Sequence, residues 1–206
     1  KVKSTDQVGE YQKLATQQVE QIDQYLFGVR IQNYIDKQDW KNVSKELKPL
    51  LEKQGAEASV DWLILWRQAE IGQQNWKEAL ATWDLQRKVD PESVETPEAL
   101  IQQGSLNEQI GDNSRALVSY RKVLENAVDP TLEAQAVGRV SSILQQQRNY
   151  TELVEFYSQR YKKSKDPQVK KNSASEIASY YATVLENPES ARIWWEKVDQ
   201  GGTSQE

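Results

Sequence analysis

Apolar and small residues recur along most of the chain at the spacing of amphipathic helices, and short polar turns interrupt them. In the clearest instance, a turn that contains Gly111 is followed by Ala116, Tyr120 and Val123, which are four and then three residues apart. This spacing places the three side chains on one face of a helix. The pattern therefore predicts pairs of helices joined by tight turns, and an all-α fold.

The same pattern occurs five times, and the positions equivalent to Ala116, here called the anchors, are spaced by 36, 37, 37 and 38 residues. Two further positions recur with the same period. One lies three residues before each anchor, and the other lies four residues after it and has a large side chain. Such a period is typical of helical repeats, in which each unit packs on its neighbours. The anchors are Val43, Ala79, Ala116, Leu153 and Ala191; the preceding positions are Trp40, Trp76, Asn113, Tyr150 and Pro188; the following positions are Leu47, Trp83, Tyr120, Tyr157 and Trp195.

Residues that stop and start helices mark the ends of the repeat units. An Asp-Pro pair follows the second helix of three units, at 90–91, 129–130 and 166–167. Because Asp caps free N–H groups and Pro fits the first helical position, each pair predicts a helix start. After the first pair, a polar connector over 93–97 leads to Pro97, which is expected to open the third unit. Gly55 ends the first unit, and a glycine pair at 201–202 ends the fifth.

These features resemble the tetratricopeptide repeat (TPR): a helix, a tight turn, a small residue, an aromatic residue one helical turn later, and a Pro before the next unit. The resemblance covers about 25–198. The period exceeds the family's value of about 34 residues. Val43 and Leu153 replace the small residue, and Arg67 and Ser141 stand where Gly104 lies in the third unit. Sel1-like repeats, which have a similar period and more glycine, are the nearest alternative.

We therefore expect a right-handed superhelical solenoid of about five TPR-like helix–turn–helix repeats, preceded by one N-terminal helix. A polar lead-in over 1–9 and a helix that starts near Tyr11 fill residues 1–24, and a polar tail fills 199–206. The helix is expected to reach about Phe27, where it can continue into the first repeat helix over 29–37. Pro49 is expected to kink its helix or shift its start. The repeat units span approximately 25–55, 56–91, 92–130, 131–167 and 168–198.

Composition narrows the classes of function. The chain has no Cys and no His, which removes disulfides, thiolate sites and the commonest general base. A formal charge of −5 argues against nucleic acid as the main partner. No apolar run approaches the roughly 18 residues of a membrane span. Because there is no Met, we expect the chain to begin inside a longer precursor, with room for a removed signal or membrane anchor, and we slightly favour an exported, periplasmic or membrane-anchored location.

We expect neither enzyme activity nor a cofactor or metal site. The chain has no phosphate-binding loop, nucleophile elbow or metal-ligand spacing. Carboxylates are plentiful, but no pair of them lies in an apolar setting suited to acid–base chemistry. Glu70, between Ala69 and Ile71, is interpreted as a residue on a helix surface.

In TPR-like arrays the first helices line a concave groove and the second helices form the outer wall. The resemblance and helical geometry imply a groove of mostly uncharged, hydrogen-bonding side chains, which suits an extended peptide or a partner helix. The chain lacks the Lys/Asn clamp with which some TPR proteins grip a C-terminal carboxylate. A hydrated surface without a ligand is the simpler alternative. The implied groove residues are Gln32, Gln68, Ser105, Ser142, Gln145 and Tyr180.

Two other features are candidate contacts for a partner. Trp62 falls off the main apolar stripe, so we expect it to be the exposed tryptophan and an aromatic contact, whereas the other tryptophans of the second unit pack between repeats. Segment 160–171 is half basic in an acidic chain, and it is either a solvated loop or a contact for an acidic partner or an anionic lipid surface. Its basic residues are Arg160, Lys162, Lys163, Lys165, Lys170 and Lys171.

The sequence thus predicts a scaffold or adaptor that binds a partner peptide or helix in its groove, as part of a larger, cell-envelope assembly. One alternative is a structural subunit that self-assembles through the ends of the solenoid, where Trp194 and Trp195 lie. Another alternative is the non-catalytic helical domain of a larger enzyme.

Overall fold

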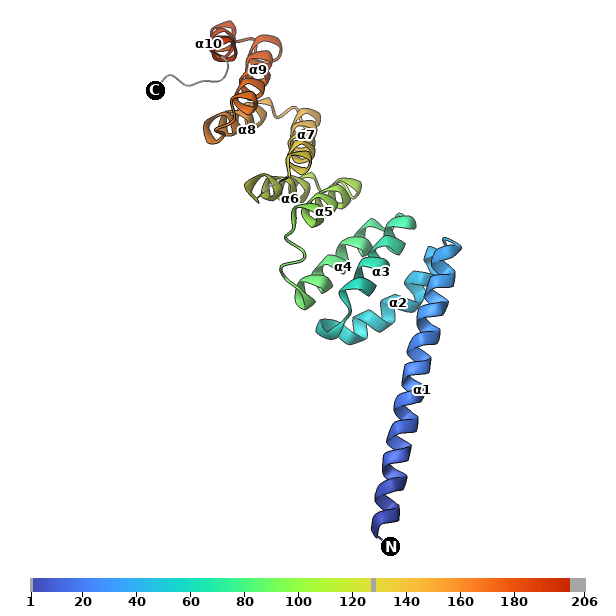
Figure 1. Cartoon of the computed structure of the whole chain (residues 1–206). Helices are drawn as coiled ribbons and strands as arrows, with labels where there is room; N and C mark the ends of the chain where they lie inside the picture. Colours follow the sequence, from blue (N-terminus) through green and yellow to red (C-terminus); the bar gives the residue numbers. More distant parts are fainter. Residues whose placement is uncertain (1, 127–128, 201–206) are drawn as a thin grey trace. The chain divides into compact units, whose positions relative to one another are not determined.

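The computed structural model describes residues 2–126 and 129–200, and these contain ten α-helices, one short 3-10 helix and no strand (Figure 1). This confirms the predicted all-α class. The elements are α1 (Val2–Asp36), α2 (Trp40–Gln54), η1 (Gly55–Glu57), α3 (Val60–Gly72), α4 (Trp76–Val89), α5 (Pro97–Gln109), α6 (Asn113–Asn126), α7 (Pro130–Gln146), α8 (Tyr150–Lys163), α9 (Pro167–Thr183) and α10 (Pro188–Asp199).

The helices belong to two compact units, α1–α5 in the first and α6–α10 in the second, with the division between Asp112 and Asn113. Within each unit, every helix packs against the next one along the chain. Apolar side chains at helical spacing form the cores, because only one face of each helix is covered. Core residues of the first unit include Ile31, Val43, Leu47, Leu63 and Trp66. Buried residues of the second unit include Ala136, Val140, Leu144, Leu153 and Ile177.

The N-terminal end of the chain differs from the expectation. The lead-in expected over 1–9 is helical from Val2, and α1 continues without a break to Asp36. The segment contains no Pro, and an exposed glycine such as Gly9 costs a helix only about 1 kcal/mol. At the other end Asp199 closes α10, while 201–206, which include the glycine pair and most of the expected tail, lie outside the described residues.

The anchors are in register with the helices. The helices α2, α4, α6, α8 and α10 all begin at the position three residues before an anchor. Every anchor side chain is at most 5% exposed. The repeated small or apolar residue is therefore a buried contact in the first turn of each of these helices.

Each turn that leads into these five helices contains a residue with a left-handed backbone, five residues before the anchor. The φ angles of these residues lie between +48° and +79°. A left-handed backbone costs a residue that has a Cβ about 1–2 kcal/mol of conformational energy, and only one of the five residues is a glycine. The five are Gln38, Gln74, Gly111, Arg148 and Glu186.

Backbone hydrogen bonds hold the first four of these turns in one form. The left-handed residue donates its N–H to the carbonyl three residues back, and the next residue donates to the carbonyl five residues back. In the turn at Gln38, these bonds reach Ile35 and, from Asp39, Tyr34, each at 2.8 Å. This is the Schellman motif, which satisfies carbonyls left free at a helix end. The turn at Glu186 differs, since its closing bond spans six residues.

The residue after the left-handed one is Asp or Asn in all five turns. Three of these side chains accept a hydrogen bond from the N–H three residues further on, which caps the following helix. The common local signal is therefore an Asp or Asn after the left-handed position, rather than the glycine found at Gly111. The three capping residues are Asp39, Asn149 and Asn187.

Two of the three predicted Asp-Pro helix starts are confirmed, and one is wrong. Asp129 and Asp166 cap α7 and α9. Asp90 instead closes α4, and α5 begins at Pro97. The connector after Asp90 folds into a turn of its own, in which Val94 is fully buried and displaces the helix start.

Pro49 does not shift the start of its helix, although the sequence offered that as one of two outcomes. The helix α2 begins at Trp40, directly after its Asp39 cap, and continues past Pro49 to Gln54. Pro49 therefore neither ends this helix nor delays its start.

Changing Gln74 to glycine should stabilise the protein by about 0.5–1 kcal/mol, because glycine takes the left-handed conformation at little cost. Gly111→Ala should destabilise it by about 1 kcal/mol for the opposite reason. Urea unfolding followed by circular dichroism measures both changes. Gln102→Gly, at an exposed position inside α5, is the matched control and should destabilise by about 1 kcal/mol. Effects of the same sign for the two Gln→Gly changes would contradict the assignment of the turn.

Ala116→Leu should destabilise the protein by about 1–3 kcal/mol, because the Ala116 side chain is fully buried and leaves no room for three further carbons. Ser114→Ala, two residues earlier on the exposed side of α6, should change the unfolding free energy very little. Thermal unfolding of both variants distinguishes the two positions. Equally mild effects would show that the repeat register is wrong.

Candidate functional site

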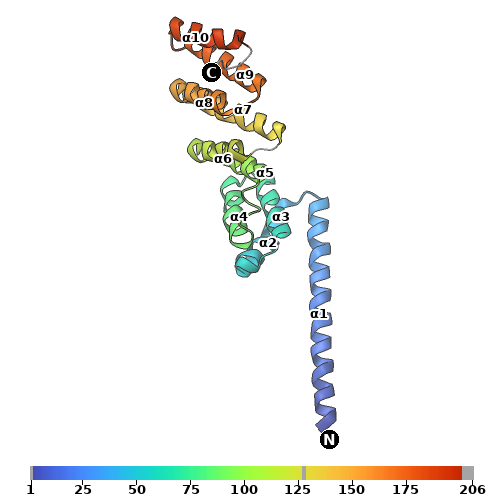
Figure 2. The same cartoon turned by 60° about the vertical axis from the view of Figure 1, so that its left-hand side comes forward.

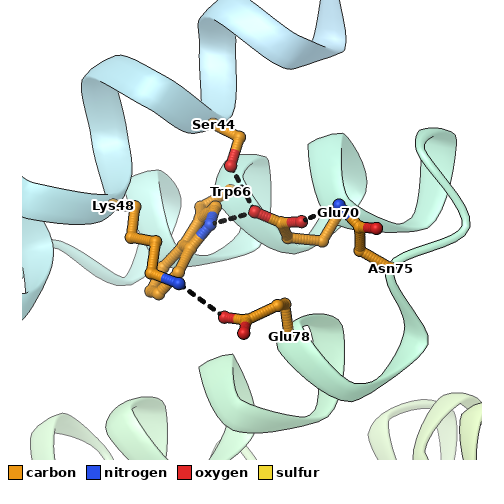
Figure 3. Close-up of polar contacts among 6 residues, drawn as sticks. All are labelled: Ser44, Lys48, Trp66, Glu70, Asn75 and Glu78. Carbon is orange, nitrogen blue, oxygen red and sulfur yellow. Dashed lines mark hydrogen bonds and ion pairs between the residues drawn. The ribbon is translucent and has the colours of Figure 1, made fainter.

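A network of polar side chains connects α2, α3 and α4 in the first unit (Figure 3). Glu70, at its centre, is only 2% exposed, so the expectation that it lies on a helix surface is wrong. One carboxylate oxygen accepts hydrogen bonds from Trp66 Nε1, at 2.8 Å, and from the Ser44 hydroxyl. The other oxygen accepts from Asn75 Nδ2 at 2.9 Å. Three donors from three helical segments thus compensate the burial of this charge.

The geometry of this network is that of a structural carboxylate. Ser44 comes from α2, and Asn75 precedes the first residue of α4, so Glu70 fixes both neighbours of α3. Beside it, Lys48 forms a 2.7 Å ion pair with Glu78, but both side chains are more than a third exposed, and such a pair contributes little to stability. The hydrogen bond to Glu78 raises the pKa of Lys48.

Arg67 is a second buried charge in the first unit, at 3% exposure. Its Nε donates a hydrogen bond to Thr82 Oγ1 at 2.9 Å, and its Nη2 donates one to Gln86 Oε1. The guanidinium carbon lies 3.2 Å from the centre of the Trp83 ring. Burial lowers the pKa of Arg67 to about 9, so the group is charged at neutral pH. Stacking on Trp83 explains how the long Arg67 side chain fits at the position that corresponds to Gly104 in the third of the five predicted repeat units.

The groove residues predicted in the first unit lie on the surface of three separate helices. Gln32 and Gln68 are exposed, and Ser105 is half-buried. Gln32 donates from Nε2 to Asp36 on its own helix, at 2.8 Å. Among the described residues, no hydrogen bond joins the three positions to one another.

In the second unit the structure brings two of the predicted groove residues together. Gln145 of α7 donates a hydrogen bond from Nε2 to the hydroxyl of Tyr180 on α9. The Tyr180 ring lies 6.5 Å from that of Tyr157, in a stacked arrangement, and 6.2 Å from that of Tyr150. The Tyr157 hydroxyl shares a 2.8 Å hydrogen bond with Ser141. These five residues, here called the tyrosine cluster, connect α7, α8 and α9.

Burial raises the pKa of both Tyr157 and Tyr180 above the usual tyrosine value, so both hydroxyls are protonated at neutral pH. The sequence pattern identified Tyr150 and Tyr157 only as positions in step with an anchor. Their positions on either side of the anchor Leu153 are the signal that was available. The remaining predicted residue, Ser142, accepts a 3.4 Å hydrogen bond from Gln146 on its own helix and takes no hydrogen bond from the cluster.

The expectation that Trp62 is the exposed tryptophan is wrong. Trp62 is half-buried and packs edge-on against Phe27, with 5.7 Å between the ring centres. The uninterrupted course of α1 places Phe27 over this part of α3. Trp195 on α10 is the exposed tryptophan, at 42%.

The basic segment 160–171 is mostly helical rather than a loop, because α8 continues to Lys163 and α9 begins at Pro167. Arg160 is half-buried and forms a 2.8 Å ion pair with Glu133. The Lys170 ammonium lies 5.6 Å from the centre of the Tyr161 ring. The exposed basic residues of the segment are Lys162, Lys163, Lys165 and Lys171.

A cavity of about 430 Å³ opens beside this segment in the second unit, lined by residues of α6, α7, α8 and α9. Arg121 and Arg160 lie on its wall, but the first pairs with Glu152 at 2.6 Å and the second with Glu133. Glu125 and Glu133 also line it. Because both signs of charge face the cavity and the arginines are paired, its electrostatics favour no anionic ligand.

In the parts of the chain that the structure describes, no cluster of Asp and Glu side chains forms a candidate metal site, and no helix combines the length and apolarity of a membrane span. No protein-family model matches the chain, and a search of curated proteins finds no significant match.

Glu70→Ala should destabilise the first unit by about 3 kcal/mol, because it leaves the buried Trp66 N–H and the half-buried Ser44 hydroxyl without an acceptor. Glu78→Ala, which removes the neighbouring surface ion pair, is the control and should cost less than about 1 kcal/mol. Urea unfolding followed by tryptophan fluorescence reports on this unit, since five of the seven tryptophans lie between Trp40 and Trp83. Equal losses in the two variants would contradict the structural role of Glu70.

Proposed function

We propose that the chain is a TPR-like helical repeat array without catalytic activity, which serves as a scaffold for protein–protein interaction. The repeated helix starts, the buried anchors and the recurring left-handed turns support the repeat architecture. The first helices of the repeats would then form the face on which a partner peptide or helix binds.

The hydrogen bond between Gln145 and Tyr180 carries this proposal. It joins the first helices of two successive repeats, α7 and α9, and it fixes two side chains that still reach the surface. The stacking of Tyr180 on Tyr157 holds the ring in place. A group that is already ordered loses less conformational entropy on binding, and tyrosine is among the residues that dominate binding energy at interfaces.

The chemistry of this face suits a polypeptide. An amide and a phenol hydroxyl are both donor and acceptor, so they match the alternating N–H and C=O groups of a peptide backbone. The apolar ring edges of the tyrosine cluster offer contacts for apolar side chains of the same peptide. A partner of this kind would be neutral or weakly charged where it touches α7 and α9.

A second candidate function is self-assembly through the C-terminal end of the array. Ile193 and Trp195, both on α10, are 48% and 42% exposed. Large apolar side chains at the end of a repeat array need a cover, either a polar cap or another molecule. This observation favours a structural subunit over a hydrated end.

Crosslinked pull-down from the source cells, followed by mass spectrometry, tests the groove. A variant with Ser142→Glu and Gln145→Glu should lose a partner that the unchanged chain captures, because two charges enter the peptide-binding face. Thr151→Glu with Gln159→Glu, at exposed positions of α8, is the matched control and should capture the partner normally. Circular dichroism verifies that both variants are folded. Equal capture by all three proteins would exclude α7 and α9 as the binding face.

A further inference from the structure

The helix α1 carries a long apolar face that nothing in its own unit covers. Apart from Phe27, the large apolar side chains from Val8 to Val29 are each 48% to 71% exposed. At about 100° per residue they fall within roughly 140° of the helix circumference. We call this face the α1 stripe; it includes Val8, Tyr11, Val19, Ile22, Tyr25, Leu26 and Val29.

A different face of the same helix packs on the repeats. Ile31 is buried in the core with α2 and α3, and Phe27, Tyr34 and Ile35 pack against that core. These four residues lie on the side of the helix roughly opposite to the stripe. In both Figure 1 and Figure 2, the N-terminal part of α1 extends beyond α2, α3 and α4. Packing within the first unit therefore leaves the stripe free to contact another molecule.

The stripe has the seven-residue spacing of a coiled coil. A coiled coil has two core positions in each seven-residue repeat, called a and d. The d positions are Val8, Ala15, Ile22 and Val29. The a positions are Gln12, Val19, Leu26 and Asn33. Two of the four a positions are polar, Gln12 and Asn33, and an Asn at an a position is typical of coiled coils with a fixed register and number of strands. Their partner in such a seam is the same residue of a second helix.

The flanking positions are compatible with a second copy of the same helix. In a parallel pair, each g position faces the e position five residues later on the other helix. The pairs are then Tyr11 with Thr16, Gln18 with Asp23, and Tyr25 with Arg30. No two like charges face each other in these pairs, so the flanking positions do not oppose pairing of the helix with a second copy.

The size of the stripe also fits a stable interface. Seven half-exposed apolar side chains, two of them tyrosines, present several hundred Å² of apolar surface, comparable to the roughly 800 Å² per partner of a standard-size interface. Apolar patches of this size on a soluble protein mark sites of association.

We propose that the α1 stripe is a self-association surface, through which two copies of the chain form a parallel coiled coil over 8–33. This surface is separate from the peptide-binding face on α7 and α9 and from the α10 end, so the proposal does not rest on the scaffold function.

Sedimentation velocity of the whole chain over a wide range of concentration tests this. The unchanged chain should dimerise with rising concentration, and Val19→Glu with Leu26→Glu should raise the dimer Kd by about 100-fold or more, because four like charges would enter the seam. Both positions are exposed, so the variant should keep its fold, as circular dichroism verifies. Gln17→Glu with Gln24→Glu adds the same charges to another exposed face of α1 and should leave dimerisation unchanged. A chain that stays monomeric overturns the proposal, and so does a dimer that persists in the Val19/Leu26 variant but is lost with Trp195→Glu.

Disulfide trapping tests the orientation, since the chain has no cysteine of its own. Val8→Cys and Val29→Cys, prepared separately, should each give a disulfide-linked dimer under mild oxidation, because equal positions meet in a parallel pair. A crosslink that forms only when the two variants are mixed would show an antiparallel pair and overturn the parallel arrangement.

Discussion

The left-handed residue between two consecutive helices is the constraint on which the described fold depends. It lets two backbone hydrogen bonds close the end of one helix while the next residue, an Asp or Asn, caps the start of the following helix. The link is therefore short, and its geometry places a buried anchor at one defined position of the next helix. In the turns at Gln38, Gln74 and Arg148 the residue is not glycine, so burial of the anchor and the two hydrogen bonds must offset a strain of about 1–2 kcal/mol.

Periodicity predicted the helices and the anchors well, because a helix with one buried face has apolar residues at regular three- and four-residue spacing. It failed where burial depends on a distant segment. Glu70 is buried because Ser44 and Asn75 converge on it, and no local pattern encodes that convergence. Trp62 is covered because Phe27 of α1 packs on it, and no local pattern encodes this contact between two distant segments.

The candidate binding face was predictable in part for the same reason. The resemblance and helical geometry together implied that Gln145 and Tyr180 share one face, and the two side chains are in contact. They did not predict that Tyr157, on a second helix, reaches across to stack on Tyr180. The two units thus use different chemistry for their internal polar contacts. The first buries the charges of Glu70 and Arg67. In the second, the buried hydroxyls of Ser141 and Tyr157 are neutral, and the ion pairs of Arg121 and Arg160 are partly exposed.

The continuity of α1 has a mechanical consequence. The exposed stripe and the face that packs on α2 belong to one helix, so the angle between them is set by helical phase and cannot vary without breaking backbone hydrogen bonds. Insertion of a single residue near Gly28 would rotate one face against the other by about 100°. A molecule bound to the stripe would therefore have a fixed rotation and a fixed distance relative to α2 and α3. In such a complex α1 would be a rigid connection and not a flexible linker.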